Sequence, residues 1–111
     1  MKKDMIFVPT MLLVAIALFL YGATGLGAHI AIAVVGVLVL AAYTSATRKE
    51  WKMPALEIAM RVFYGIALIT GVIANATAIP ALDIVHKASA VLFVIALVVL
   101  FMVKLVANKK C

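Results

Sequence analysis

Apolar residues fill four long stretches of the chain, and most of the charged residues gather between and around these stretches. A membrane-spanning helix needs about 20 mainly apolar residues. The pattern therefore predicts four transmembrane helices, at 5–24, 26–45, 54–76 and 81–107. Because the connections are short, consecutive helices are expected to be antiparallel neighbours. We predict an all-α polytopic membrane protein, with one four-transmembrane-helix bundle over residues 1–111.

The composition agrees with a membrane protein and narrows the classes of function that the chain can have. Hydrophobic residues make up 68% of the chain and charged residues 13%, and the mean hydropathy is +1.30. Such values lie far outside those of soluble domains. The chain has no nucleophile elbow, cysteine pair or glycine-rich phosphate loop, which excludes the enzyme classes built on these motifs. An electron-transfer subunit or a quinone-linked oxidoreductase stays compatible with the sequence.

The positive charges predict the orientation in the membrane. In a four-span arrangement one side carries Lys2, Lys3, Arg48, Lys49, Lys52, Lys109 and Lys110. The connections on the opposite side, near 24–27 and 75–82, contain no Lys or Arg. The positive-inside rule then predicts a multi-pass protein of the plasma (inner) membrane with both termini in the cytoplasm. The net charge of +6 indicates contact with anionic lipid rather than nucleic-acid binding.

The only two histidines begin similar apolar segments, at 29–40 and 86–97. Six of the twelve aligned positions are identical, and the offset between the segments is 57 residues, about half of the chain. We interpret this similarity as a repeated helical hairpin, at about 1–52 and 53–111. Because both copies start on the same side of the membrane, their pseudo-two-fold axis is expected to lie along the membrane normal.

The two histidines are candidate ligands of a cofactor. Both fall in about the first two turns of helices that run inward from the outer face. Ala33 and Ala90 lie four residues further on and share the faces of the histidines, and Gly36 continues that face. Small side chains below each imidazole leave space for a flat ligand. Haem iron accepts neutral imidazole as an axial ligand, so the pattern predicts one b-type haem with two histidine ligands.

This arrangement resembles the four-helix di-haem membrane cytochromes b, in which four helices supply two bis-histidine haems, one towards each membrane face. The resemblance covers the whole four-helix topology but only one ligand pair, because the helices at 5–24 and 54–76 contain no histidine. It implies electron transfer through one haem b near the outer face, held by His29 and His86. A quinone or a redox protein is the implied partner, and the chain is also a candidate homo-oligomer.

Other interpretations of these polar residues stay open. A histidine in a membrane helix also serves as a plain hydrogen-bonding group between helices. Zinc is a weaker candidate, since two histidines leave its usual four-ligand set incomplete. Asp83, one turn before His86, is a candidate third ligand or a group that orients the imidazole. Lys87 is either a lysine at the membrane interface or a partner of a haem propionate.

A second polar stripe runs along the helix predicted at 54–76. Glu57 and Arg61 are spaced to form an ion pair, with Tyr64 or Tyr43 as a supporting group. The same stripe is also a candidate site for a quinone headgroup or for protons. It supports an alternative function, a haem-free small transporter, accessory subunit or structural subunit. Small multidrug transporters have a similar length, but they carry an essential Glu in their first helix, and no charged residue follows Asp4 there.

Three further residues have structural interpretations. Gly65 and Gly71 are candidate points of close helix contact. Trp51, which lies beside Lys and Arg residues, is expected to anchor the chain at the membrane interface.

Overall fold

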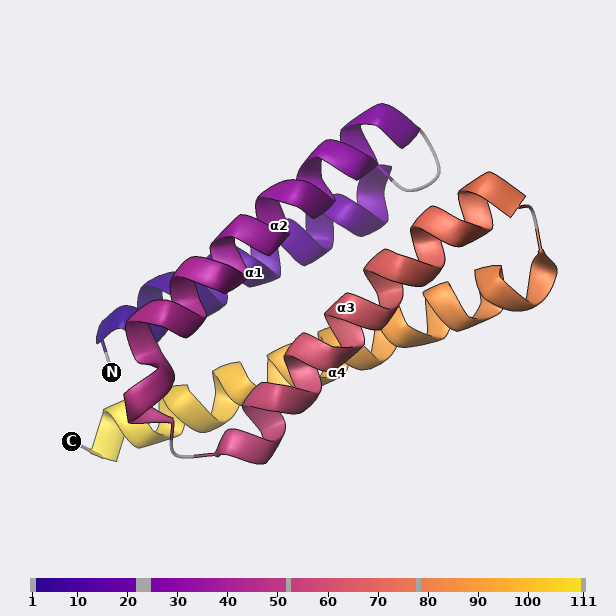
Figure 1. The fold of residues 1–111 in the computed structure, drawn as a ribbon. Coiled ribbons are helices and arrows are strands. Elements are labelled where there is room, and N and C mark those ends of the chain that lie inside the picture. The colour runs from indigo at the N-terminus through magenta and orange to yellow at the C-terminus, as the bar shows by residue number, and fades with distance from the viewer. Residues whose placement is uncertain (1, 22–24, 52, 78, 111) are drawn as a thin grey trace. The chain divides into compact units, whose positions relative to one another are not determined.

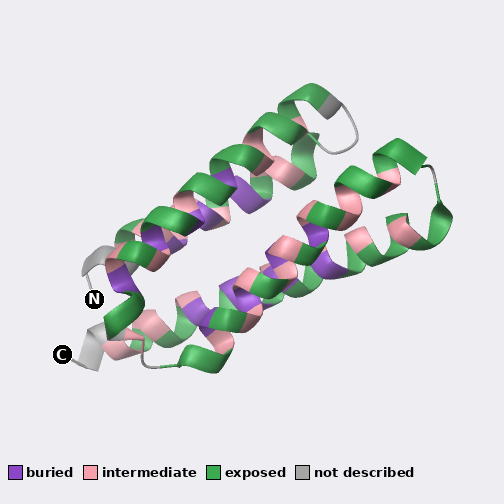
Figure 2. Ribbon diagram, viewed as in Figure 1, coloured by how far each residue is buried: buried purple, intermediate pink, exposed green. Residues whose placement is uncertain are grey.

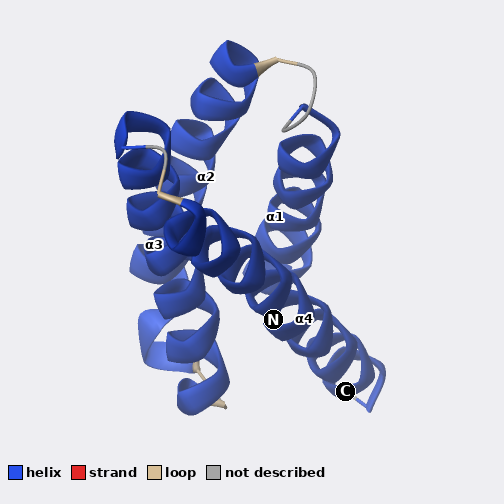
Figure 3. Cartoon of the chain, turned by 90° about the vertical axis from the view of Figure 1, so that its right-hand side faces the viewer, coloured by secondary structure: helices blue, strands red, loops and turns tan. Residues whose placement is uncertain are grey.

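The computed structural model describes residues 2–21, 25–51, 53–77 and 79–110, and this part of the chain is helical apart from short connections (Figure 1). The elements are α1 (Lys2–Tyr21), α2 (Leu26–Thr47), the short 3-10 helix η1 (Arg48–Glu50), α3 (Pro54–Thr77) and α4 (Pro80–Lys110). Figure 3 shows helices and loops only over these residues. The predicted all-α class and the four helices are confirmed. The predicted end of the first helix, residue 24, lies outside the described residues.

Three helices are long and apolar enough to cross a membrane, over Gly27–Thr47, Pro54–Thr77 and Pro80–Ala107. The apolar part of α1, Met5–Tyr21, is shorter and close to the lower limit for a span. Large apolar side chains are exposed along all four helices, and exposed residues cover much of each ribbon in Figure 2. In lipid, such surface faces hydrocarbon rather than water. The chain is therefore a multi-pass membrane protein that contacts the bilayer.

Helices α3 and α4 begin in the same way. Residues 54–61 and 80–87 both follow the order Pro-Ala-Leu-acid-Ile, then two variable positions and a basic residue. Proline suits the first position of a helix because its missing N–H would have no partner there. Glu57 and Asp83 lie in the first turns, where negative charge is favourable near the positive end of the helix dipole.

The described residues form two compact units, and each has its own buried residues. Unit 1 comprises Met1–Lys52 together with Leu97–Cys111, and unit 2 comprises Met53–Ala96. One boundary between the units falls after residue 52, and the last part of α4, from Leu97, groups with unit 1. That the two hairpins are related by a pseudo-two-fold axis stays a prediction.

In unit 1, α1 and α2 lie side by side as an antiparallel hairpin (Figure 1). Their buried side chains recur every three or four residues, which places them along one face of each helix. The set comprises Val8, Met11, Val14 and Ala15 on α1, and Leu40, Tyr43 and Thr47 on α2.

In unit 2, the buried face of α3 repeats at alternating intervals of three and four residues. Glu57, Met60, Tyr64 and Ala67 form this face. Such spacing is typical of a helix face that packs along a second helix. The ring of Tyr64 packs edge-on against Phe93 of α4, with centroids 4.9 Å apart.

Candidate functional site

His29 lies in the first turn of α2, and its imidazole is bonded to α1. The Nδ1 atom is 2.9 Å from the carbonyl oxygen of Leu18. Because a carbonyl oxygen only accepts hydrogen bonds, Nδ1 carries a proton and is the donor in this contact. The contact is partly buried and fixes the direction of the ring.

His86 lies in the second turn of α4 and makes the same kind of bond to α3. Its Nδ1 atom is 2.6 Å from the carbonyl oxygen of Ala67. The same reasoning makes Nδ1 the donor. Each histidine therefore lies near the start of the second helix of a hairpin and donates to a backbone carbonyl of the first helix. The predicted placement within the first two turns is confirmed.

Gly71 allows the ring of His86 to lie directly against the backbone of α3. A Cβ atom built on Gly71 would lie 2.8 Å from Cε1 and 2.9 Å from Nδ1 of His86. Real Cβ atoms essentially never approach so closely, so residue 71 has to be glycine for this packing. Gly71 is thus confirmed as a point of close contact. Gly65, the other candidate, has nothing within 4 Å of a Cβ built there, among the described atoms.

The two acceptor carbonyls share a feature of the sequence. Leu18 and Ala67 each stand four residues before a glycine, which is residue 22 in one hairpin and residue 71 in the other. Residue 22 lies outside the described residues, and the structure describes the glycine contact only at Gly71. That the two imidazoles face one another at one depth stays a prediction.

The other residues expected around a cofactor have mixed positions. Gly36 is buried, and Ala33 and Ala90 are half-buried. Lys87 pairs with Asp83 across one helical turn at 3.0 Å, and both side chains are exposed.

Asp83, an expected orienting group for His86, is thus engaged by Lys87, while the carbonyl of Ala67 orients the imidazole. Every residue has a backbone carbonyl, so the sequence alone could not identify that of Ala67 as the partner of His86.

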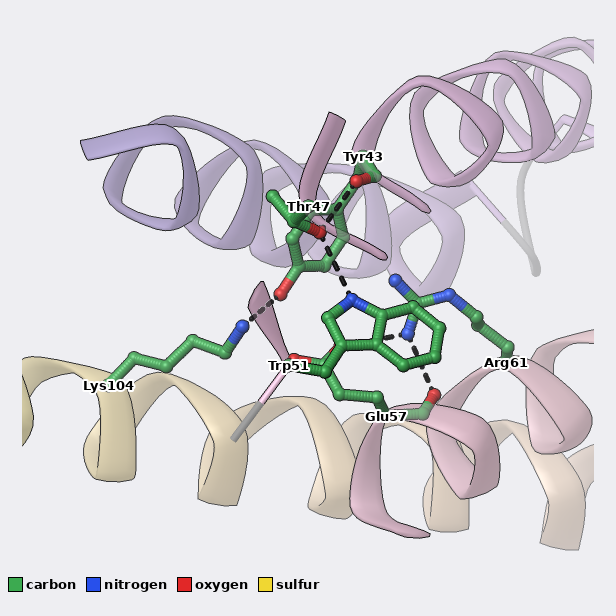
Figure 4. A network of polar contacts seen from close by, with 6 residues as sticks. All are labelled: Tyr43, Thr47, Trp51, Glu57, Arg61 and Lys104. Atoms are coloured by element: carbon green, nitrogen blue, oxygen red, sulfur yellow. Dashed lines mark hydrogen bonds and ion pairs between the residues drawn. The ribbon is translucent and has the colours of Figure 1, made fainter. Parts of the chain in front are cut away.

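The predicted pair of Glu57 and Arg61 is confirmed. Nη1 of Arg61 lies 2.8 Å from Oε2 of Glu57 and also donates to the backbone carbonyl of Glu57 at 2.8 Å (Figure 4). The Glu57 side chain is only 1% exposed and that of Arg61 is 17% exposed. Charged groups within a span are costly unless they are paired. The pair therefore neutralises two charges that lipid would otherwise exclude.

A second polar cluster in unit 1 was not predicted as a cluster. Nζ of Lys104 donates to the hydroxyl of Tyr43, whose ring stacks on Phe7 with centroids 5.5 Å apart. The hydroxyl of Thr47 donates to the carbonyl of Tyr43 at 2.7 Å and accepts from the indole Nε1 of Trp51 at 3.2 Å (Figure 4). In the sequence, Tyr43, Thr47 and Trp51 are spaced four residues apart, which indicates that they are neighbours on one helix face.

Replacing Thr47 by valine tests this cluster. The buried hydroxyl links Trp51 to α2, so its loss is expected to destabilise the chain by about 1 kcal/mol. Trp51 is the only tryptophan, so its emission spectrum should shift as the indole N–H changes partner.

Thr77→Val is the matched control, because the Thr77 hydroxyl is exposed and makes the same bond one turn back, to Ile73 at 2.7 Å. An unchanged Trp51 emission in Thr47→Val would contradict the assigned bond.

The described side chains offer few ligands to a metal ion. Within the described ranges, no three His, Cys, Asp or Glu residues come together in a group that could hold a metal. Comparison with known proteins finds no match, neither to a protein-family model nor to a curated protein or a solved structure. The functional argument therefore rests on the two histidines and on the buried polar groups.

Proposed function

We propose that this chain is a membrane-bound b-type cytochrome, and that His29 and His86 are the axial ligands of one haem b. The observation that carries the proposal is the bond from each Nδ1 to a backbone carbonyl. Histidines that bind metal almost always donate their other ring N–H to a carbonyl, a carboxylate or water. Such a bond orients the ring and makes the ligating nitrogen more basic.

The donor set fits haem better than zinc. A porphyrin supplies four nitrogens, so the iron needs only two ligands from the protein, whereas zinc usually takes four ligands, at least three of them from the protein. Two neutral imidazoles match the first requirement. The small residues that follow on the same helices, Ala33, Gly36 and Ala90, present little bulk to a flat macrocycle.

A bound haem would supply a one-electron carrier within the membrane. The residues of the chain would set its position. The carbonyls of Leu18 and Ala67 orient the two imidazoles, and Gly71 admits the ring of His86 close to α3. The positive-inside rule supports cytoplasmic termini in the plasma (inner) membrane, which would place this site near the outer face. A quinol or a redox protein there is the proposed partner.

Spectroscopy of the purified chain tests the proposal. Protein produced with added haem precursor should show the reduced-minus-oxidised spectrum of low-spin bis-histidine haem. His29→Gly and His86→Gly should each abolish this spectrum, and added imidazole should restore it by occupying the vacated ligand position. Thr77→Val, an exposed change on α3, should keep the spectrum.

Two outcomes would overturn the proposal. One is a colourless protein that is nevertheless folded, as judged by circular dichroism and by its elution as a single species. The other is a low-spin spectrum that survives removal of either histidine.

A second function is favoured by one specific observation, the buried Glu57. The Glu57 side chain is 1% exposed, and most other residues of α3 are apolar. Ionisable groups inside spans usually mark function or pairing. In this case the chain would be a haem-free transporter, accessory subunit or structural subunit that uses Glu57, Arg61 and Tyr64. The variant Glu57→Gln/Arg61→Met should then fold but fail in a complementation assay. Wild-type behaviour of this variant, together with failure of His29→Gly, would exclude the second function.

A further inference from the structure

The net positive charge of the chain is concentrated in unit 1. Eight of the ten Lys and Arg residues and two of the four acidic residues lie in Met1–Lys52 and Leu97–Cys111, so this unit carries the whole net charge of +6. The two basic residues of unit 2 are each paired with an acid, Arg61 with Glu57 and Lys87 with Asp83. Unit 2 is therefore neutral, and an anionic partner is expected to bind unit 1.

Within unit 1, the short helix η1 presents two cations next to the only tryptophan. Arg48 and Lys49 are exposed, and neither forms an ion pair with any side chain that the structure describes. Trp51 follows directly after η1. Tryptophan prefers the level of the lipid headgroups, where its ring contacts apolar chains and its N–H meets polar groups.

The position of η1 is fixed from the buried side. The indole of Trp51 donates to Thr47 at 3.2 Å, and Thr47 donates to the carbonyl of Tyr43 at 2.7 Å (Figure 4). Thr47 and Tyr43 are 1% and 0% exposed, and the Tyr43 hydroxyl also accepts from Lys104. These bonds hold Trp51 at the end of α2, so the exposed Arg48 and Lys49 lie where an apolar helix of spanning length ends.

We propose that Arg48, Lys49 and Trp51 form a binding surface for the headgroup of an anionic phospholipid. The planar guanidinium of Arg48 matches two phosphate oxygens, and Lys49 adds a second positive charge. Trp51 packs at the glycerol level of the same lipid. A phospholipid fits better than a soluble phosphate, because it places an apolar tail along the exposed apolar surface of α2 and its phosphate at η1.

Fluorescence of Trp51 measures this binding directly. The full chain is reconstituted into phosphatidylcholine vesicles that contain brominated phosphatidylglycerol or, in parallel, brominated phosphatidylcholine, since bromine quenches a nearby indole. We expect brominated phosphatidylglycerol to quench Trp51 several-fold more strongly than brominated phosphatidylcholine at equal mole fraction. Arg48→Gln/Lys49→Gln should bring the ratio of the two quenching constants to about 1. Lys109→Gln/Lys110→Gln removes the same charge from the C-terminal end of α4 and should leave the ratio unchanged.

Every other outcome overturns the site. A ratio that persists in Arg48→Gln/Lys49→Gln excludes η1, and an equal loss in both double variants shows a diffuse surface charge instead of a site. Equal quenching by both lipids in the wild-type chain excludes a preference for anionic lipid. Displacement of the brominated lipid by inorganic phosphate would identify the ligand as soluble phosphate. None of these measurements involves haem, so the result stands apart from the proposed cytochrome function.

Discussion

Glu57→Ala is expected to destabilise the folded chain by about 3–5 kcal/mol, because it removes one partner of a buried ion pair. The carboxylate is 1% exposed and bonds Nη1 of Arg61 at 2.8 Å. Its removal leaves the Arg61 cation without this carboxylate on a membrane-spanning helix, where an unmatched charge is costly. Unfolding in mixed micelles, followed by circular dichroism as the fraction of denaturing detergent rises, measures the change.

The chain contains its own control for this prediction. Asp83 and Lys87 have the same spacing and stand at the same positions of α4 as Glu57 and Arg61 of α3, but their side chains are 54% and 73% exposed. Exposed ion pairs contribute about 0–1 kcal/mol, so Asp83→Ala should be nearly silent. Equal effects of the two substitutions would show that Arg61 reaches polar surroundings without Glu57.

The double variant Glu57→Gln/Arg61→Met separates the charge from the packing. Neutral side chains of similar volume in place of a buried ion pair are often tolerated without loss of stability. We therefore expect the double variant to unfold close to wild type, although Glu57→Ala does not. This folded variant is also the one that tests the transporter alternative, since a loss of activity in it cannot be attributed to misfolding.

The helices could be predicted from the sequence because the membrane imposes one solution. Runs of apolar residues of spanning length must satisfy their backbone hydrogen bonds internally, and short connections with proline at residues 54 and 80 mark where helices begin. The ion pair of Glu57 and Arg61 was equally predictable, since residues four apart on a helix are neighbours. In both cases the decisive contacts are local in the chain.

The surroundings of the histidines could not be predicted, because their partners are distant in sequence and lie in the backbone. His29 and His86 could be selected as candidates by residue type. The choice of the carbonyls of Leu18 and Ala67 as acceptors depends on how neighbouring helices pack. The same holds for the bond from Lys104 to Tyr43, which joins residues 61 positions apart.

Gly71→Ala is expected to displace His86, because the new Cβ would lie 2.8 Å from Cε1 and 2.9 Å from Nδ1 of the ring. Relief of the clash requires the imidazole to move off α3 and to weaken its bond to the carbonyl of Ala67, now 2.6 Å long. Overpacking of this kind destabilises proteins by about 1–3 kcal/mol. If the chain binds haem, the low-spin spectrum should also weaken or the reduction potential of the haem should change, because a displaced axial ligand binds iron less well.

Gly65→Ala is the matched control, since it lies on the same helix and a Cβ there meets nothing within 4 Å among the described atoms. Alanine favours a helix over glycine by about 1 kcal/mol, so this variant should be as stable as wild type or more stable. Opposite signs for two identical substitutions six residues apart would identify the contact with His86 as the cause. Equal stability of both variants, with an unchanged spectrum in any protein that binds haem, would show that His86 does not pack on residue 71.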